Sequence, residues 1–303
     1  MGFRDRAWWG VLAVIVAAGV AVLAGDVDDT VDAGAAFEVW GDVVRDVDQF
    51  GLTLAGISAA DETRLGRELA APWMPSASSP WQDYVDAVGR RLTAHVRRRG
   101  IDYRFHVLAV SDVNAFALPG GDVFVTEGLL EFLRSEAELA FVLGHEIAHV
   151  DQRHAIERLA ARIALERIML DDLAGIADLG PAFVRAGYRK YQELEADLAG
   201  MHLASAAGYD PDAAVAPLRR LAGREPTPSA GPRSTPLAEA AGAVLTGLGS
   251  YLDTHPVTLE RVRRLEQLIA GRRWWGRARH GYRGVENHRR KVPRAAQEFP
   301  DEA

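Results

Sequence analysis

The feature that most restricts the fold of this 303-residue chain is an apolar helical segment with three polar side chains in its middle. The pattern S-E-A-E from Ser135 is typical of a helix-capping box, and the run LAFVLGHEIAHV follows it. A helix that is apolar on all sides has to lie inside the fold. Its His145, Glu146 and His149 are then buried as well, which is costly for such groups unless they find partners. The segment therefore predicts a central helix whose polar groups need partners from elsewhere.

These three residues form the sequence H-E-x-x-H. Four residues is about one helical turn, so His145 and His149 leave the same face and can bind one metal ion. Glu146 is then directed at a water molecule on that metal. The chain has no cysteine, which excludes thiolate metal sites, iron–sulfur clusters and cysteine nucleophiles. A metal site in this chain must therefore consist of histidine and carboxylate ligands.

A zinc site of this kind needs a third protein ligand and an open position for water. The segment YQELEADLAG places Glu193 and Asp197 one helical turn apart. We predict that Glu193 is the ligand and that Asp197 accepts a hydrogen bond from the other ring nitrogen of a ligand histidine. Glu195 points away from that face and is the alternative ligand if the register differs.

Upstream of the capped helix, the apolar period changes from helical spacing to two. Residues 103–109 alternate between two faces, which predicts a strand. The runs VNAFAL and DVFVT follow, and Pro119-Gly120-Gly121 between them predicts a hairpin. Most of the remaining sequence has helical periodicity. We therefore expect an α+β fold, mainly α, with a small sheet of about three strands.

The N-terminal residues are directed to a membrane. Residues 7–25 are uncharged, and their length is close to the roughly 20 residues that span a bilayer. Arginines precede the stretch and aspartates follow it, so the positive-inside rule puts the rest of the chain outside the cytoplasm. We predict that residues 1–25 form a membrane anchor. The alternative is a signal peptide cleaved after Ala24, which would leave a soluble secreted or periplasmic protein.

Composition divides the rest of the chain. Residues 26–51 are an acidic spacer, and residues 52–270 form the main domain, with a proline-rich flexible loop at 223–237. Residues 271–303 are basic, and we expect a disordered tail that could also contact anionic lipid. The net charge of −7 argues against a nucleic acid partner, which needs a concentrated basic surface.

Four motifs in this chain resemble those of the HtpX/BepA-type gluzincin zinc metallopeptidases, relatives of the CAAX prenyl endopeptidases. They are the hairpin VNAFALPGGDVFVTEGLL, HEIAHVDQRH, the run E-x-E-A-D that begins at Glu193, and THPVTLERVRRL. The resemblance extends from about Leu52 to Leu268. It implies a zincin-like metallopeptidase domain with an active-site helix. Unlike many relatives, this chain has a single predicted membrane segment, and we expect a short basic tail where BepA-like members carry a helical-repeat domain.

The resemblance also implies roles for the site residues. One Zn²⁺ per chain would be bound by His145, His149 and Glu193, with Glu146 as the general base. The substrate would be an extended or unfolded polypeptide, cleaved during quality control of misfolded or envelope proteins. The alternative functions are a membrane-tethered chaperone or adaptor whose zinc-containing groove binds peptide without turnover, and an envelope scaffold without metal.

Asn114, Ala115 and Phe116 resemble the edge strand with which these peptidases hold a substrate. Strand addition holds a peptide by its main chain and tolerates many side chains. We therefore predict that these three residues bind substrate.

The segment that begins at His255 matches a further motif of the family, with Arg261 six residues later. In BepA-like members this histidine can occupy the fourth zinc position and keep the enzyme closed. His255 is therefore a predicted gate or transition-state donor.

The remaining histidines receive no role in the predicted chemistry. Arg153 and His154 match the family, but neither lies one turn from His149 on the ligand face, so we assign them structural roles. The others have no partner pattern, and we expect ordinary structural or surface positions for them: His95, His106, His202, His280 and His288.

Overall fold

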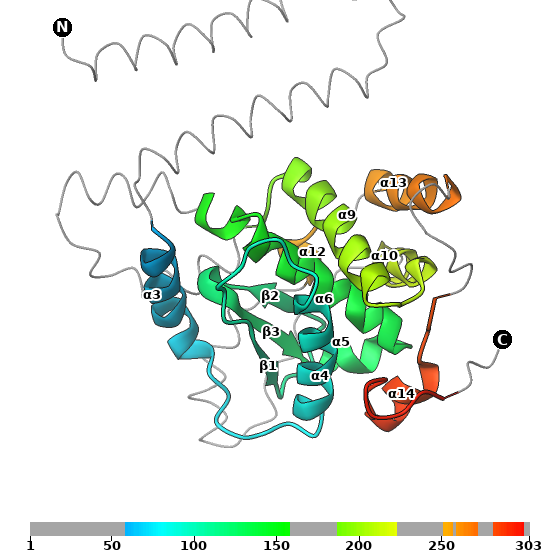
Figure 1. Ribbon diagram of the computed structural model, residues 1–303, viewed down its shortest axis with the longest axis horizontal. Helices are drawn as coiled ribbons and strands as arrows, with labels where there is room; N and C mark the ends of the chain where they lie inside the picture. The colour runs from blue at the N-terminus through cyan, green and yellow to red at the C-terminus, as the bar shows by residue number, and fades with distance from the viewer. Residues whose placement is uncertain (1–57, 158–186, 223–250, 257–258, 272–280, 300–303) are drawn as a thin grey trace, which may run out of the picture. The chain divides into compact units, whose positions relative to one another are not determined.

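The computed structural model describes residues 58–157, 187–222, 251–256, 259–271 and 281–299 (Figure 1). All of them belong to the unit that covers residues 48–303. The elements are α3 (Ala59–Ala70), η1 (Ala71–Trp73), α4 (Gln82–Thr93), β1 (Arg104–Leu108), β2 (Ala115–Ala117), η2 (Pro119–Gly121), β3 (Asp122–Thr126), α5 (Glu127–Phe132), α6 (Glu136–Asp151), α9 (Lys190–Ala206), η4 (Pro211–Ala214), α10 (Val215–Ala222), α12 (Tyr251–Thr254), α13 (Leu259–Ala270) and α14 (Val285–Arg290). The predicted anchor, acidic spacer and flexible loop lie outside the described residues and stay predictions.

Three short strands form one mixed sheet. β1 runs parallel to β3, and β3 runs antiparallel to β2, so the order is β1-β3-β2 and β2 lies at an edge. The predicted hairpin is formed by β2 and β3, which η2 joins. Gly120 and Gly121 have φ angles of 83° and 106° in this turn, values that only glycine adopts readily. The described residues are otherwise mainly helical, so the predicted fold class is confirmed.

Helix α6 lies at the centre of the described residues and contacts the sheet, α4 and α9 (Figure 1). Every residue from Glu136 to Val150 is buried, as its apolar sequence predicts. Ser135 Oγ accepts a hydrogen bond from Glu138 N at 3.2 Å, which caps the first turn. The Glu138 carboxylate accepts from Arg134 N at 2.8 Å, so the return bond of the predicted capping box goes to the preceding residue.

Helices α6 and α9 approach each other closely at two glycines. A Cβ atom on Gly200 would lie 2.6 Å from the backbone nitrogen of His145, and one on Gly144 would lie 2.8 Å from the carbonyl oxygen of Gly200. Any larger side chain would push the two helices apart. Glu193 and Asp197 precede Gly200 on α9, so this close approach brings both carboxylates to the histidines of α6.

Residues 281–299 correct the expectation of a disordered C-terminal tail. This segment contains α14 and packs against the start of α6. The backbone N–H groups of Glu136 and Ala137 donate to the carbonyl oxygens of Gly284 and Arg283, at 3.1 and 2.9 Å. The first turn of a helix leaves such N–H groups without partners inside the helix. The C-terminal segment therefore supplies acceptors for the start of α6.

Several basic residues of this segment, whose charge predicted disorder, have acidic partners. Arg289 and Arg290 both form ion pairs with Glu286, at 2.7 and 2.9 Å, and Arg294 pairs with Glu298 at 2.6 Å. These local pairs offset the like charges that predicted disorder. Residues 272–280 and 300–303 lie outside the described part of the chain.

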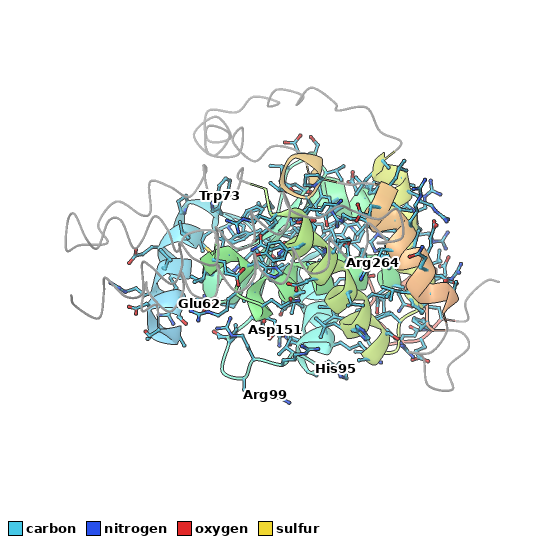
Figure 2. The ribbon with its side chains drawn as sticks, turned by 90° about the horizontal axis from the view of Figure 1, so that it is seen from above. Glu62, Trp73, His95, Arg99, Asp151 and Arg264 are labelled. Carbon is cyan, nitrogen blue, oxygen red and sulfur yellow. The ribbon has the colours of Figure 1, made fainter. Side chains whose placement is uncertain are left out.

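An ion-pair network joins α3 to the end of α6. Glu62 Oε2 lies 2.8 Å from Arg98 Nη2 and 3.2 Å from Arg153 Nε, and Arg98 N donates to Asp151 at 2.8 Å. Figure 2 shows Glu62 and Asp151 in this region and His95 on the outside of the loop between α4 and β1. Arg153 thus has a structural contact, as expected.

Within the ranges that the structure describes, no helix combines the length and the apolar character needed to cross a bilayer. The predicted membrane anchor lies outside these ranges.

Candidate metal centre and active site

Four buried side chains from three segments meet beside the second half of α6. His145 and His149 come from α6, Glu193 from the first turn of α9, and His255 from the residue after α12. One donor atom of each lies within 4.8 Å of all the others, and none of the four side chains is more than 2 % exposed. The structure therefore brings together the three predicted ligands and the predicted gate.

Four distances between the donor atoms are close to those of a tetrahedral metal site. His145 Nε2 lies 3.1 Å from His149 Nε2 and 3.2 Å from His255 Nδ1. Glu193 Oε1 lies 2.9 Å from His255 Nδ1 and 3.4 Å from His149 Nε2. In a tetrahedral zinc site with bonds of roughly 2.0–2.1 Å, the ligand atoms are about 3.4 Å apart. The four side chains are thus spaced as ligands of one ion.

Hydrogen bonds alone do not satisfy this arrangement. A neutral imidazole has one N–H group, and ring nitrogens of His145, His149 and His255 converge here on the single carboxylate group of Glu193. Next to them, Glu146 is fully buried, and neither of its carboxylate oxygens has a hydrogen-bond donor among the described residues. His255 Nε2 lies 3.3 Å from Glu146 Oε1. Such buried acceptors are costly without a cation or a donor, so the residues fit a metal ion and a polar reactant.

The outer ring nitrogen of His145 faces the predicted carboxylate. His145 Nδ1 lies 3.0 Å from Asp197 Oδ1. Arg261 donates two hydrogen bonds of 2.7 Å to Asp197, and its Nη1 lies 2.6 Å from Glu193 Oε2. Arg261 is fully buried, so one guanidinium compensates two buried carboxylates. The family motif includes Arg261, but spacing along the chain does not indicate its partners Asp197 and Glu193.

These charges set the protonation of the cluster. Burial alone would raise the pKa of Glu193, but His255 and Arg261 hold it well below the ordinary value of 4.5. Burial lowers the pKa of His149 well below 6.5. Burial acts in the same direction on His145, but Asp197 and Glu193 outweigh it and raise the pKa of His145 to about 9. Glu193 is therefore ionised and His149 neutral at pH 7, the forms in which they bind metal, whereas His145 would have to release a proton to bind one.

Two tyrosines stack on the cluster, and the sequence analysis missed both. The Tyr188 ring lies 3.6 Å from the His149 ring, with 13° between their planes. The Tyr251 ring lies 4.7 Å from the His255 ring, with 24° between planes. Tyr251 precedes His255 by one helical turn, a spacing that could have indicated it. Tyr188 lies in extended chain before α9, and no sequence pattern points to its contact.

The predicted substrate strand lies at the sheet edge but is buried. Asn114, Ala115 and Phe116 are at most 4 % exposed. Just before them, the carbonyl oxygen of Val113 accepts a hydrogen bond of 3.0 Å from Tyr251 N. The strand is therefore joined to the segment that carries His255. Its role in substrate binding stays a prediction.

The other histidines divide as follows. His154, to which we assigned a structural role, contacts a predicted ligand, and its Nδ1 lies 2.9 Å from His149 Nδ1. Glu195, the alternative ligand, lies outside the cluster and contacts His154. His106 pairs with Asp122 and His288 with the carbonyl oxygen of Leu130, His95 is exposed and His202 partly buried, and His280 lies outside the described residues.

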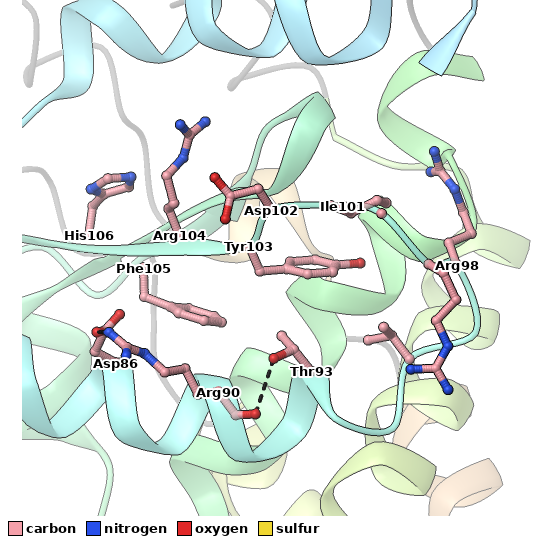
Figure 3. Close-up of a pocket in the computed structure, with 13 residues that line it drawn as sticks. Asp86, Arg90, Thr93, Arg98, Ile101, Asp102, Tyr103, Arg104, Phe105 and His106 are labelled. Atoms are coloured by element: carbon pink, nitrogen blue, oxygen red, sulfur yellow. Dashed lines mark hydrogen bonds and ion pairs between the residues drawn. The ribbon is translucent and has the colours of Figure 1, made fainter. Parts of the chain in front are cut away.

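A separate cavity of about 690 Å³ lies between α4, the following loop and β1 (Figure 3). Two of its arginines have carboxylate partners: Arg104 pairs with Asp122 and Arg98 with Glu62, at 2.7 and 2.8 Å. No member of the metal cluster lines it. The cavity therefore gives no reason to place the active site there.

Comparison with known proteins agrees with the site. The sequence pattern of peptidase family M48 matches residues 80–269, which is more than half of the chain. The chain belongs to peptidase family M48, which places it among the metallopeptidases and implies a metal cofactor.

Three relatives illustrate the match. The mitochondrial metalloendopeptidase OMA1 of Schizosaccharomyces pombe is 32% identical over 193 residues, which cover 61% of this chain and 52% of the relative. The OMA1 of Arabidopsis thaliana is 31% identical over 191 residues, covering 60% of this chain and 34% of the relative. The beta-barrel assembly-enhancing protease of Escherichia coli is 31% identical over 155 residues, covering 46% and 32%. The aligned region thus makes up between a third and half of each relative.

Proposed function

We propose that this protein is a zinc-dependent metalloendopeptidase that hydrolyses internal bonds of extended polypeptides. The observation that carries the proposal is the buried cluster of His145, His149, Glu193 and His255, with the carboxylate of Glu146 beside it. His145, His149 and Glu193 would hold the zinc ion. When bound, zinc supplies Lewis acidity for the attacking water and the scissile carbonyl.

Glu146 performs the proton transfers in this proposal. Its carboxylate has no hydrogen-bond donor among the described residues, so it can accept the proton of the attacking water. The same carboxyl group then gives a proton to the leaving amine as the C–N bond breaks. Because the site is fully buried, the carboxylate acts where bulk water does not compete with it.

His255 lies where it can control access to this chemistry. Its Nδ1 faces the ligands, and its Nε2 lies 3.3 Å from Glu146 Oε1. In this position it occupies the fourth corner of the cluster, so the proposed role is that of a gate that must move before substrate binds. A histidine at this place could also act as a transition-state donor once it has moved.

The proposed substrates are extended or unfolded polypeptides, paired by their main chain with the strand that contains Asn114, Ala115 and Phe116. We further propose that the N-terminal segment anchors the protein in a membrane, with the catalytic domain outside the cytoplasm. The proposed role is quality control of misfolded, envelope or membrane-associated proteins, and the relatives named metalloendopeptidase and beta-barrel assembly-enhancing protease support polypeptide substrates.

The test compares the wild type with Glu146→Gln in zinc content and in cleavage of casein. Glu146→Gln should keep one zinc per chain and lower the cleavage rate by roughly 10²–10⁴-fold, because proton transfer is lost while the ligands stay. Glu131→Gln, an exposed change on α5, is the matched control and should cleave like the wild type. Cleavage by Glu146→Gln at the wild-type rate would contradict the proposal and favour a protein that binds peptide without turnover.

A further inference from the structure

Behind His149, a chain of two hydrogen bonds leads from the metal cluster to a partly exposed carboxylate. His149 Nδ1 lies 2.9 Å from His154 Nδ1, and His154 Nε2 lies 3.3 Å from Glu195 Oε2. The side chain of His154 is 2 % exposed, whereas that of Glu195 is 26 % exposed. We propose that His154 and Glu195 are positioning residues that hold His149 in the tautomer with a lone pair directed at the metal. This inference rests on the proposed function, since it requires a metal ion among the four donors.

The positions of the protons follow from the two contacts. Between His149 Nδ1 and His154 Nδ1, one nitrogen donates and the other accepts. If His149 donates, its Nε2 keeps the lone pair that a metal needs, and His154 carries its own proton on Nε2. That proton points to Glu195, an acceptor when ionised. All groups are then satisfied.

The opposite placement of the protons, with His154 Nδ1 as the donor, gives unfavourable contacts both at His149 and at Glu195. If His154 donated from Nδ1, His149 would carry its proton on Nε2, where it would point at the ligands and block metal binding. His154 Nε2 would then present a lone pair to the Glu195 carboxylate, and two acceptors would face each other. The carboxylate at the end of the chain therefore selects the tautomer of a histidine that it does not touch.

The chain turns sharply to allow this contact. Helix α6 ends at Asp151, and Arg153 adopts a left-handed conformation with φ of 63°. For a residue other than glycine this costs roughly 1–2 kcal/mol, and the contact of Arg153 with Glu62 holds the turn. The reversal places His154 over the outer side of His149. A helix continued through these residues would have carried His154 away from it.

The two helical ligands thus have different partners on their outer nitrogens. His145 faces Asp197 directly, and Arg261 neutralises that carboxylate. His149 reaches its carboxylate through a second imidazole. A carboxylate partner on a ligand histidine fixes ring orientation and raises ligand basicity, and the relay gives His149 the same support over a longer distance.

The test measures zinc affinity of the full-length protein in detergent, by competition with a chromophoric chelator. His154→Phe removes the acceptor and should weaken zinc binding about 10–100-fold. Glu195→Ala should weaken it about threefold to tenfold, and Glu195→Gln less, because the amide oxygen can still accept. The visible spectrum of the Co²⁺-loaded protein should change most in His154→Phe, less in Glu195→Ala and least in Glu195→Gln. His95→Ala and Glu131→Ala, both at exposed positions, are controls and should bind zinc like the wild type.

Thermal unfolding of the metal-free variants separates this effect from a loss of folding. If His154→Phe does not fold, the two variants of the partly exposed Glu195 decide the question. Wild-type zinc affinity and an unchanged Co²⁺ spectrum in the folded variants would overturn the relay while leaving the proposed function intact. Absence of zinc binding in the wild type would overturn both.

Discussion

Two glutamates on α6, Glu136 in the first turn and Glu146 near the end, are equally buried but have opposite surroundings. Both are 0 % exposed. Glu136 accepts hydrogen bonds from the Tyr209 hydroxyl at 2.7 Å and from Arg294 N at 3.1 Å. The carboxylate of Glu146 has no such donor among the described residues. The chain itself supplies hydrogen-bond donors for the glutamate at the start of the helix. The glutamate in the second half is left to interact with a bound group.

The two glutamates differ in their expected effect on the stability of the fold. A buried polar group with partners contributes to the free energy of unfolding, and one without partners is costly. Proteins keep such costly groups mainly at functional sites. The arrangement around Glu146 is therefore an argument for function that does not depend on sequence similarity.

We expect the largest effect on stability from removing Arg261, the cation that compensates the buried carboxylates beside the second half of α6. Arg261→Ala leaves the buried carboxylates of Asp197 and Glu193 without their cation, and it should lower the free energy of unfolding by about 3–5 kcal/mol. Denaturant unfolding of the metal-free protein measures this. Arg263→Ala, an exposed change on α13, should alter stability by less than about 0.5 kcal/mol. Equal effects of the two variants would show that Arg261 does not compensate the cluster.

Added zinc should stabilise the protein through the residues beside the second half of α6 and not through those at its start. Zinc at 100 times its dissociation constant should stabilise the wild type by about 2.7 kcal/mol, because the ion binds the folded state alone. A chelator should reverse this change. His149→Ala should lose the response, while Glu136→Gln should keep it. The measurement is denaturant unfolding with and without zinc, and stabilisation of His149→Ala by the same amount would contradict the assigned ligand set.

The smallest effect concerns the start of the helix and depends on pH. Glu136→Gln should lower stability by about 1–3 kcal/mol without loss of zinc binding, because a carboxyl group with several partners is replaced. Burial raises the pKa of Glu136 above its ordinary value of 4.5, so the folded state retains a proton that the unfolded state has lost. The stabilising contribution of Glu136 is therefore fully present below pH 4.5 and decreases as the pH rises through the folded-state pKa.

Unfolding of both proteins between pH 4 and pH 8 checks this sign. The difference in stability between wild type and Glu136→Gln should shrink as the pH rises. A difference that grows with pH would show that the folded-state pKa of Glu136 is lowered.

The local parts of the site could be predicted from sequence because helical spacing determines them. His145 and His149 are one turn apart on α6, and Glu193 and Asp197 are one turn apart on α9. Spacing says which residues share a face of one helix. It does not say that α9 crosses α6 at Gly200, and that crossing decides which carboxylate reaches which histidine.

The parts that sequence could not provide depend on chain reversals and on contacts between distant segments. His154 was excluded from the site by helical geometry, which no longer applies once Arg153 turns the chain. Tyr188 reaches His149 from extended chain. The C-terminal residues were predicted to be disordered from their charge, but backbone carbonyl oxygens make their contact with α6, and composition carries no information about those.

The backbone hydrogen bonds from Glu136 and Ala137 to Gly284 and Arg283 can form only later in the synthesis of the chain than those within α6. Translation proceeds from the N-terminus, so the histidines of α6 leave the ribosome long before these acceptors exist. The first turn of the helix gains these partners only after residues 283 and 284 have been made. The start of α6 therefore reaches its final hydrogen bonding later in synthesis than the part of the helix that carries the histidines.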